Sequence, residues 1–511
     1  MNESRTKKTF LNARINLICY FASLITAFFT RKILLENLGA EFIGFTGTIG
    51  SLLGFLNLAE LGIGTAIGYV LYKPIANKDR FKINEIISVL GYLYKWIGLA
   101  ILGGGFVLSL FLPLIFPSTT FSWGTIYFGF YVYLAASLIG YFANYKAALL
   151  SADQRNYIVT GYFQISTTSK VIIQMILAIY FSSFILYFAI ELLFGIINSI
   201  ILNLKINQTY PWLKSEIKLG SKLLKKHPEI SKYIKQIFAH KIGTLAQYQL
   251  SPFLIYTYTS LPIVALYTNY TILTQKLESL ISTTINSTGA AIGNLVAEGN
   301  KEKTISIFKE LLALRIFIAT ISTVCIYKFS SPFIMVWLGK EYILDNKIVL
   351  IITILSGLGI ARGILDQFLH AYGLYADIWA PYVESAILAT CSIMFGYYWG
   401  LGGVLMGPLF SIIIIIYIWK PYYLFAKGFK VPVINYWVSL SKYIIISLGT
   451  IYATNYIYQT FALKLIAPTN WGGLFMHGMI YVTLTTLSLS LTYYILFHEF
   501  RQTVHRIINH K

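Results

Sequence analysis

Polar side chains recur at helical spacing inside long apolar runs of this sequence. In the run 157–181, Gln164, Thr167, Lys170 and Gln174 lie three to four residues apart and therefore share one face of a helix. Ionisable groups at membrane depth are costly, so they usually face a bundle interior or a wet cavity. The stripe predicts either polar contact with a neighbouring helix or part of a cavity wall.

Three further runs carry such stripes. The residues are His240, Thr244, Gln247 and Ser251 in one run, Thr268, Thr271, Gln275, Glu278, Ser279, Ser282 and Asn286 in the next with Lys276 at its margin, and Arg362, Asp366 and His370 in the last. The spacing of four residues between Arg362 and Asp366 predicts that these two side chains pair. We interpret most hydroxyl groups as contacts between helices, and His240 and His370 as structural.

Cations need a different explanation, because helix packing does not require them. Lys170, Lys276 and Arg362 predict a cavity wall that attracts an anionic cargo, and an arginine can bind phosphate through two parallel hydrogen bonds. The candidate substrate-binding set is Lys170, Lys276, Arg362, Asp366, Gln164, Gln247 and Gln275. The three cysteines lie inside apolar runs without metal-ligand spacing, so we expect no metal and no cofactor.

Composition places these residues in a membrane protein. Of 511 residues, 57% are hydrophobic and only 12% are charged, whereas soluble domains carry roughly 25% charged residues. Long apolar runs can satisfy their backbone in lipid only as helices, which predicts an all-α polytopic fold. The net charge of +20 resides largely in short connections, as expected for loops beside an anionic leaflet rather than for a nucleic-acid partner.

About fourteen transmembrane helices are expected. Their ranges are 10–35, 42–72, 84–116, 121–146, 157–181, 183–206, 236–258, 261–298, 304–330, 346–373, 378–399, 401–426, 434–460 and 472–498. Lys and Arg concentrate in alternate connections and at both ends, which predicts cytoplasmic termini in a multi-pass protein of the cytoplasmic membrane.

A short internal repeat suggests how the helices are grouped. The sequence Ala66–Gly68 precedes Asn77 and Lys78, and Ala291–Gly293 precedes Asn300 and Lys301 in the same way. Six helices separate the copies, so the two lobes would run in the same sense. The expected domains are an N-lobe at 1–206, a basic cytoplasmic linker at 207–235, a C-lobe at 236–430, and an added helix pair with a tail at 431–511.

The segment 31–77 resembles a known family. Its matching features are Arg31, Leu38, Gly39, Glu41, Gly44, the sequence AELGIG from Ala59 to Gly64, and Tyr72 to Pro74. They are similar to the Wzx-like polysaccharide and O-antigen flippases of the multidrug/oligosaccharidyl-lipid/polysaccharide (MOP) exporter superfamily, which includes MATE transporters and lipid II flippases.

The resemblance implies a mechanism and partners. Two six-helix lobes would form a V around a cationic cavity and carry an undecaprenyl-diphosphate oligosaccharide, a repeat unit of O-antigen, capsule or exopolysaccharide, by alternating access across the bacterial inner membrane. Membrane lipids, polysaccharide polymerase machinery and a coupling ion, H⁺ or Na⁺, are the further partners implied. Arg31, Glu41 and Glu60 match family positions as gating or structural residues.

Other functions are less consistent with the sequence. A MATE-like drug or metabolite antiporter is the main alternative, and it predicts acidic cation sites without a cationic wall. A major-facilitator carrier lacks support, because YKPIANKDRFK stands where that family has a Gly- and Arg-rich loop. An enzyme is not expected, since no Asp-x-Asp metal site and no long outside loop occur, and no Gly-x4-Gly-Lys-Ser/Thr loop is present for ATP.

Overall fold

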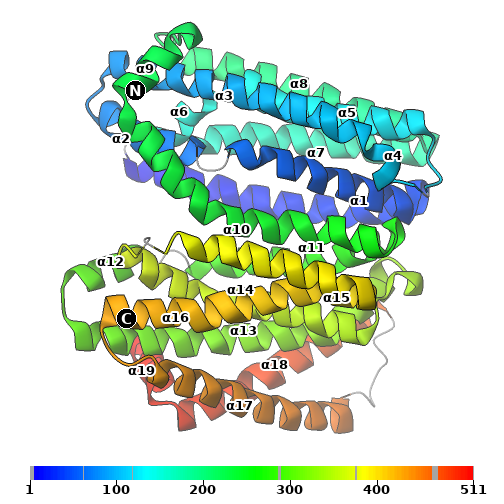
Figure 1. Cartoon of the computed structure of the whole chain (residues 1–511). Helices are drawn as coiled ribbons and strands as arrows, with labels where there is room; N and C mark the ends of the chain where they lie inside the picture. Colours follow the sequence, from blue (N-terminus) through cyan, green and yellow to red (C-terminus); the bar gives the residue numbers. More distant parts are fainter. Residues whose placement is uncertain are drawn as a thin grey trace. The chain divides into compact units, whose positions relative to one another are not determined.

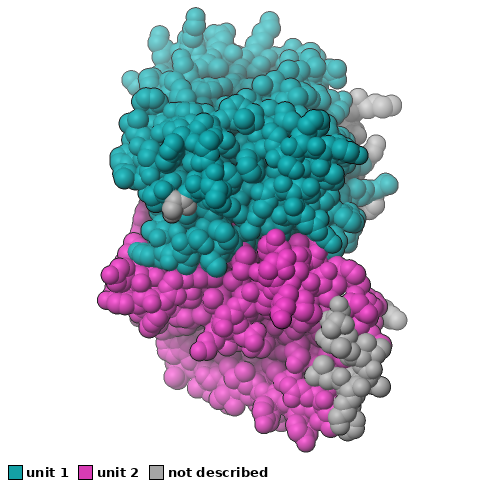
Figure 2. Space-filling view, turned by 90° about the vertical axis from the view of Figure 1, so that its right-hand side faces the viewer, with its two compact units in different colours: residues 1–265 teal, residues 266–511 magenta. Residues whose placement is uncertain are grey.

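The structure is a computed structural model of the chain, and it describes residues 5–60, 63–117, 119–285, 289–374, 377–462 and 470–509. Within these ranges every regular element is a helix (Figure 1), which confirms the expected all-α class. The chain forms two compact units, residues 1–265 and 266–511, which Figure 2 shows in separate colours.

Unit 1 is built from long helices joined by short turns. Its elements are α1 (Arg5–Leu56), the 3-10 helix η1 (Asn57–Glu60), α2 (Ile63–Ala76), α3 (Arg80–Leu110), α4 (Leu112–Ile115), α5 (Trp123–Phe142), α6 (Ala147–Ala152), α7 (Asn156–Phe181), α8 (Phe184–Thr209), η2 (Ile217–Leu219), α9 (Gly220–Lys226) and α10 (Pro228–Tyr258). The helix α7 packs against α1 and α8, and α5 packs against α3 and α8.

Unit 2 has the same character and ends in an amphipathic helix. Its elements are α11 (Leu261–Ile285, beginning at the end of unit 1), α12 (Gly289–Ala297), α13 (Lys301–Trp337), η4 (Lys340–Tyr342), α14 (Asn346–Ala371), α15 (Trp379–Ser411), the π-helix η5 (Ile412–Trp419), α16 (Lys420–Tyr423), the π-helix η6 (Leu424–Phe429), α17 (Ile434–Ile457), the π-helix η7 (Tyr458–Ala462), α18 (Trp471–Leu496) and α19 (His498–Asn509). The pair α17 and α18 packs against α13.

Nine helical stretches in the described part of the chain are long and apolar enough to cross a membrane, so the protein is a multi-pass membrane protein. Two of these stretches, Arg14–Leu56 and Trp379–Phe429, have 43 and 51 residues, far more than the roughly 20 that one crossing needs. The figure of fourteen crossings stays a prediction, as do the expected domain boundaries.

Glycines break both of the long stretches. Gly39 has φ 84° and ψ 164°, and Gly400 has φ 54° and ψ −130°. Residues with a side chain rarely adopt a positive φ, so glycine is the natural residue at each break. The breaks fall between the expected helices 10–35 and 42–72, and between 378–399 and 401–426, which confirms both of these predicted interruptions.

After Gly400 the chain returns directly along the helix that precedes it. A Cβ atom on Gly403 would lie 1.9 Å from the carbonyl oxygen of Phe395, and one on Gly407 would lie 2.0 Å from Oγ of Ser392. Ser392 in turn donates a 2.8 Å hydrogen bond to the carbonyl of Val404. The two halves of α15 are therefore in backbone contact, as small residues permit between membrane helices.

Side-chain caps fix where several helices begin. Asp79, Ser122, Ser183 and Asn300 precede α3, α5, α8 and α13, and each accepts a hydrogen bond from a backbone N–H three residues further on. A helix leaves its first N–H groups without partners, so such caps stabilise the helix by about 1 kcal/mol each.

The basic segment expected as a linker packs against the N-terminal part of α3. Glu85 of α3 lies 2.5 Å from Nζ of Lys226 and 3.0 Å from Nε2 of His227. The backbone N–H of Glu216 also donates to Oγ of Ser88 at 2.8 Å. This segment contains η2 and α9, and α10 begins within it at Pro228, so much of its length is helical.

The close contact between the two halves of α15 can be tested by substituting two adjacent glycines. We expect Gly403→Ala to destabilise the protein by about 1–3 kcal/mol, because the new methyl group must push the two helix halves apart. The matched control is Gly402→Ala, which meets no atom within 4 Å and should be neutral or slightly stabilising. Unfolding in detergent micelles measures both, and equal effects of the two substitutions would contradict the backbone contact.

Candidate functional site

A break in the helix at the end of α1 creates a polar centre in unit 1. The chain passes from α1 into the short 3-10 helix η1, and α2 begins at Ile63. The Glu60 carboxylate accepts hydrogen bonds from the hydroxyls of Tyr94, at 2.7 Å, and Tyr141, at 2.8 Å. Asn57 Oδ1 lies 3.0 Å from the Tyr141 hydroxyl and 3.3 Å from Oγ of Ser137. Glu60 is therefore held by tyrosines of α3 and α5.

A cavity of about 800 Å³ surrounds this centre. We call it the tyrosine cavity, and the residues that line it are Gly54, Asn57, Glu60, Gly64, Gly68, Tyr72, Tyr94, Ser137, Gly140, Tyr141, Asn144, Tyr145, Ala147, Ala148, Ser151, Ala152 and Gln249. Among these residues Glu60 is the one carboxylate, and none is a lysine or an arginine.

The tyrosine cavity offers hydroxyl and amide groups together with aromatic faces. Tyrosine and serine hydroxyls both donate and accept hydrogen bonds, and the amides of Asn and Gln do the same through separate atoms. Gly54 allows the carboxamide of Gln249 to approach closely, since its own Cβ would overlap that group. Such a wall suits a neutral ligand rich in hydroxyls, and its size is typical of ligand sites, roughly 300–1,000 Å³.

Lys170 is part of a bridge between α7 and α8. Its ammonium lies 2.6 Å from Oε1 of Glu191, and Nε2 of Gln174 donates to Oε2 of Glu191 and to the carbonyl of Tyr187, both at 3.1 Å. Gln164 donates within its own helix, to Thr168 at 3.0 Å. Of the polar stripe predicted on this helix, Lys170 and Gln174 therefore contact the neighbouring helix α8.

A second ion cluster lies in unit 2, centred on Asp366. Its Oδ2 lies 3.2 Å from Nε of Arg362, and its Oδ1 lies 2.6 Å from Nζ of Lys420. The predicted pairing of Arg362 with Asp366 is confirmed. Arg315 is only 2% exposed on the neighbouring helix α13, and it reaches the carbonyl of Ile360 at 3.4 Å. We call Arg315, Arg362, Asp366 and Lys420 the Asp366 cluster.

The remaining residues of the candidate set lie in several places. On α11, Gln275 is exposed and Lys276 is half-buried. Arg31 donates to the carbonyl of Ala265 at 2.8 Å, and Glu41 accepts from the backbone N–H and the hydroxyl of Thr120. The side chains of His240, Thr244 and Gln247 lie outside the described residues, as does Asn286.

Several residues of these sites were not identified from the sequence. Tyr94, Tyr141 and Tyr145 are three of 39 tyrosines, and no periodicity separates them from the others. Lys420 lies among isoleucines and aromatic residues next to Pro421, and nothing in this local sequence indicates an ion pair. Only contact with Asp366, 54 positions away, shows its role.

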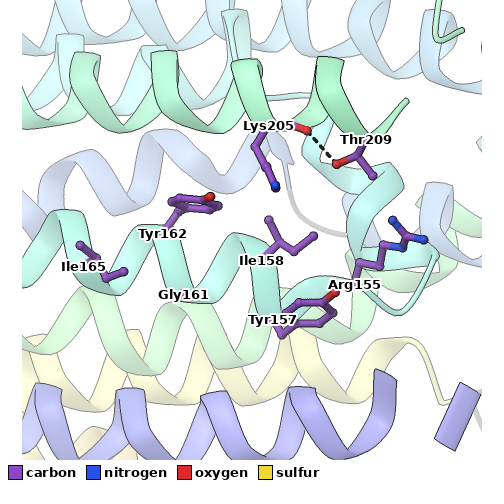
Figure 3. Close-up of a pocket in the computed structure, with 8 residues that line it drawn as sticks. All are labelled: Arg155, Tyr157, Ile158, Gly161, Tyr162, Ile165, Lys205 and Thr209. Carbon is purple, nitrogen blue, oxygen red and sulfur yellow. Dashed lines mark hydrogen bonds between the residues drawn. The ribbon is translucent and has the colours of Figure 1, made fainter. Parts of the chain in front are cut away.

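A smaller hollow opens where α7 begins and α8 ends (Figure 3). Its volume is about 570 Å³, and it is lined by Arg155, Tyr157, Ile158, Gly161, Tyr162, Ile165, Lys205 and Thr209. It shares no lining residue with the tyrosine cavity. We call it the α7–α8 hollow.

Comparison with known proteins gives structural matches. No protein family model matches the chain, and no curated protein sequence matches it. The fold is similar to that of the lipid II flippase MurJ in an inward closed conformation, with a TM-score of 0.62, 16% identity, and coverage of 93% of this chain and 98% of that one. It is also similar to an inward-facing multidrug resistance MATE family transporter of the MOP superfamily, with a TM-score of 0.57, 14% identity, and coverage of 79% and 94%. At these identities the similarity establishes a shared fold.

The Asp366 cluster gives a stability test. We expect Lys420→Met to cost about 2–3 kcal/mol, because Asp366 then keeps one cationic partner in a poorly solvated site. The double variant Asp366→Asn with Lys420→Met should recover part of this loss, since no unbalanced carboxylate remains. The free energy of unfolding in mixed micelles measures both.

The exposed Lys427 of η6 provides the matched control, and Lys427→Met should change stability little. A Lys420→Met protein as stable as the wild type, or a double variant less stable than both single variants combined, would contradict the assigned pairing.

Proposed function

We propose that this protein is a flippase that moves an undecaprenyl-diphosphate-linked oligosaccharide across the cytoplasmic membrane by alternating access. The observation that carries the proposal is the tyrosine cavity, whose wall of hydrogen-bonding and aromatic groups, without a lysine or an arginine, fits the sugar portion of such a cargo. The fold shared with the lipid II flippase MurJ supports it, because that protein's name describes a lipid-linked cargo. The 31–77 resemblance points to the polysaccharide branch.

Sugar recognition by the tyrosine cavity follows from its chemistry. Each sugar hydroxyl is both a donor and an acceptor, as are the Tyr, Ser, Asn and Gln groups of the wall. Glu60 can exchange a tyrosine hydroxyl for a sugar hydroxyl and keep its hydrogen bonds. The simplest sugars carry no net charge and need no cationic partner. A wall without lysine or arginine therefore binds them without removing water from a cationic side chain.

The diphosphate requires a separate, cationic partner. We assign this role to Lys170, Lys276 and Arg362, the cations of the candidate set. Lys170 is paired with Glu191 and Arg362 with Asp366, so a diphosphate would have to compete with a carboxylate for each. Such competition makes binding reversible, as a transporter requires, and it keeps the cations paired when no cargo is bound.

The setting proposed for this activity is the bacterial inner membrane, with both termini in the cytoplasm. The polyprenyl chain would remain among membrane lipids, and polysaccharide polymerase machinery would receive the cargo. The cargo gradient, an H⁺ or Na⁺ gradient, or the membrane potential would drive transport. The last contributes about 2.3 kcal/mol per charge per 100 mV.

A MATE-like drug or metabolite antiporter is the second candidate. The observation that favours it is Glu60, the one carboxylate in the wall of the tyrosine cavity. A carboxylate beside aromatic rings can attract an organic cation. The two candidates predict opposite cargo charges, so transport assays separate them directly.

Reconstitution into vesicles tests the proposal. The protein should accelerate movement of a fluorescent undecaprenyl-diphosphate oligosaccharide to the opposite leaflet, scored by the access of an added glycosidase. Undecaprenyl diphosphate without sugar should move more slowly, because it cannot use the tyrosine cavity. Oligosaccharide movement equal to that in protein-free vesicles, together with export of a cationic dye, would replace the flippase by the antiporter.

Two sets of variants locate the cargo. Tyr141→Phe should lower the transport rate by about tenfold, the effect of losing roughly 1.4 kcal/mol from one hydrogen bond, while the exposed Tyr397→Phe serves as the control.

The triple substitution Lys170→Gln, Lys276→Gln and Arg362→Gln should abolish transport with the protein still in the membrane. Unchanged transport in the triple variant would remove these cations from the cargo site.

A further inference from the structure

The α7–α8 hollow combines two cations with an apolar wall at one end of two membrane-crossing helices. Arg155 precedes α7, and Lys205 lies near the end of α8, four residues before its last residue Thr209 (Figure 3). Both helices are long and apolar enough to cross a bilayer. The residues that line the hollow include no carboxylate, and although Arg155 pairs with the neighbouring Asp153, Lys205 leaves the hollow with a net positive charge.

Arg155 is held in place by a chain of two partners. Its Nε lies 3.0 Å from Oδ2 of Asp153, and the Tyr210 hydroxyl donates to the same oxygen at 2.8 Å. Burial and the neighbouring carboxylate raise the pKa of Tyr210, so its hydroxyl stays protonated and continues to donate. Asp153 pairs with Arg155 through charge, yet within the described ranges the guanidinium makes no hydrogen bond, not even from its buried Nε, so its nitrogens can bind another acceptor.

Lys205 supplies the second charge. Its side chain extends from α8 toward α7, over Ile158 and Tyr162 (Figure 3). It is half-buried, and in the part of the chain that the structure describes its ammonium has no ion pair or hydrogen bond. A half-buried cation without a partner lowers its energy by binding an anion.

The apolar wall runs from this charged end along α7. Ile158, Tyr162 and Ile165 follow one another at helical spacing, and the ten residue steps from Arg155 to Ile165 span about 15 Å at 1.5 Å per residue. Ile165 is 67% exposed. Gly161, between them, adds no side chain, and a Cβ there would only touch Ile15 at 3.9 Å, so the hollow stays open.

We propose that the α7–α8 hollow binds the phosphate headgroup of an anionic phospholipid, with an acyl chain along Ile158, Tyr162 and Ile165. Basic pockets between membrane helices bind such headgroups, and an arginine with two free nitrogens matches a phosphate diester. A soluble anion would leave the apolar wall without a partner, whereas a phospholipid covers both parts. This site is independent of the proposed cargo and of the tyrosine cavity.

Lipid binding to the full-length protein tests this assignment. The protein is purified in detergent, mixed with phosphatidylglycerol or phosphatidylcholine, and examined by native mass spectrometry. Wild-type protein should retain phosphatidylglycerol about tenfold more tightly than phosphatidylcholine, because only the former carries net charge to neutralise the two cations. Equal retention of the two lipids would overturn the proposal.

Three variants separate the hollow from general surface charge. Arg155→Gln with Lys205→Gln should lower phosphatidylglycerol retention about tenfold, while Lys222→Gln, at an exposed lysine of α9, should leave it unchanged. Gly161→Leu keeps both cations but fills the hollow, so it should also lower retention. Equal losses with Lys222→Gln, or full retention with Gly161→Leu, would show that surface charge attracts the lipid without the hollow.

Two controls address folding and ligand identity. Arg155→Lys keeps the charge and should retain part of the binding, and melting temperatures verify that every variant is folded. Inorganic phosphate at millimolar concentration should not displace the lipid, since it lacks the acyl chain. Displacement by phosphate would assign the hollow to a soluble anion and overturn the lipid assignment.

Discussion

A backbone N–H or C=O group inside a bilayer has no water to bond, so a membrane helix can break only where protein groups or a wet cavity cover the break. The helix break at Asn57–Glu60 obeys this constraint. Hydroxyls of Tyr94, Tyr141 and Ser137 donate to the side chains of Glu60 and Asn57 there, and the tyrosine cavity, which opens beside the break, gives its backbone access to water. The breaks at Gly39 and Gly400 meet the constraint in another way. A single residue with a positive φ changes the chain direction there, so few backbone groups leave the helical hydrogen-bonding pattern. Where the backbone leaves the helix is therefore where this protein can expose polar groups to a ligand.

The same scarcity of water explains why the charges within the helices come in groups. Lys170 has Glu191, and Asp366 has both Arg362 and Lys420. An isolated charge in such surroundings costs several kcal/mol, while a paired one costs much less. Pairing does not remove a cation from function. Under the proposed function, pairing sets the strength with which an anionic cargo must compete for these cations.

The sequence predicted the secondary structure better than the sites. Apolar runs and charge placement are local properties, so the all-α class, the helices at 157–181 and 183–206, and the interruptions near Gly39 and Gly400 could be predicted. Arg362 and Asp366 could also be paired, because four residues on one helix fix their distance. The partners of Glu60 and Lys170 lie on other helices, and their identity depends on how the helices pack. That information is not contained in periodicity.

The tyrosine cavity was missed for the same reason. Its wall draws on residues from Gly54 to Gln249, and apart from Glu60, Gly64 and Tyr72, which belong to the 31–77 resemblance, they carry no distinctive motif. Uncharged polar residues and glycines are common in membrane helices as packing residues, so they attract attention only when they converge. The basic segment after α8 was recognisable by composition, yet its helical structure and its attachment to Glu85 and Ser88 depend on α3.

The bond between Asp366 and Lys420 has a consequence for how this protein can diverge. Each of the two charges is tolerated in its surroundings because the other one balances it. A mutation at one position therefore destabilises the protein until the second position also changes. Relatives of this protein are therefore expected to keep both residues, exchange their charges, or lose both together. The same reasoning applies to Lys170 and Glu191, and correlated substitution at these two pairs would record the helix contacts in evolutionary history.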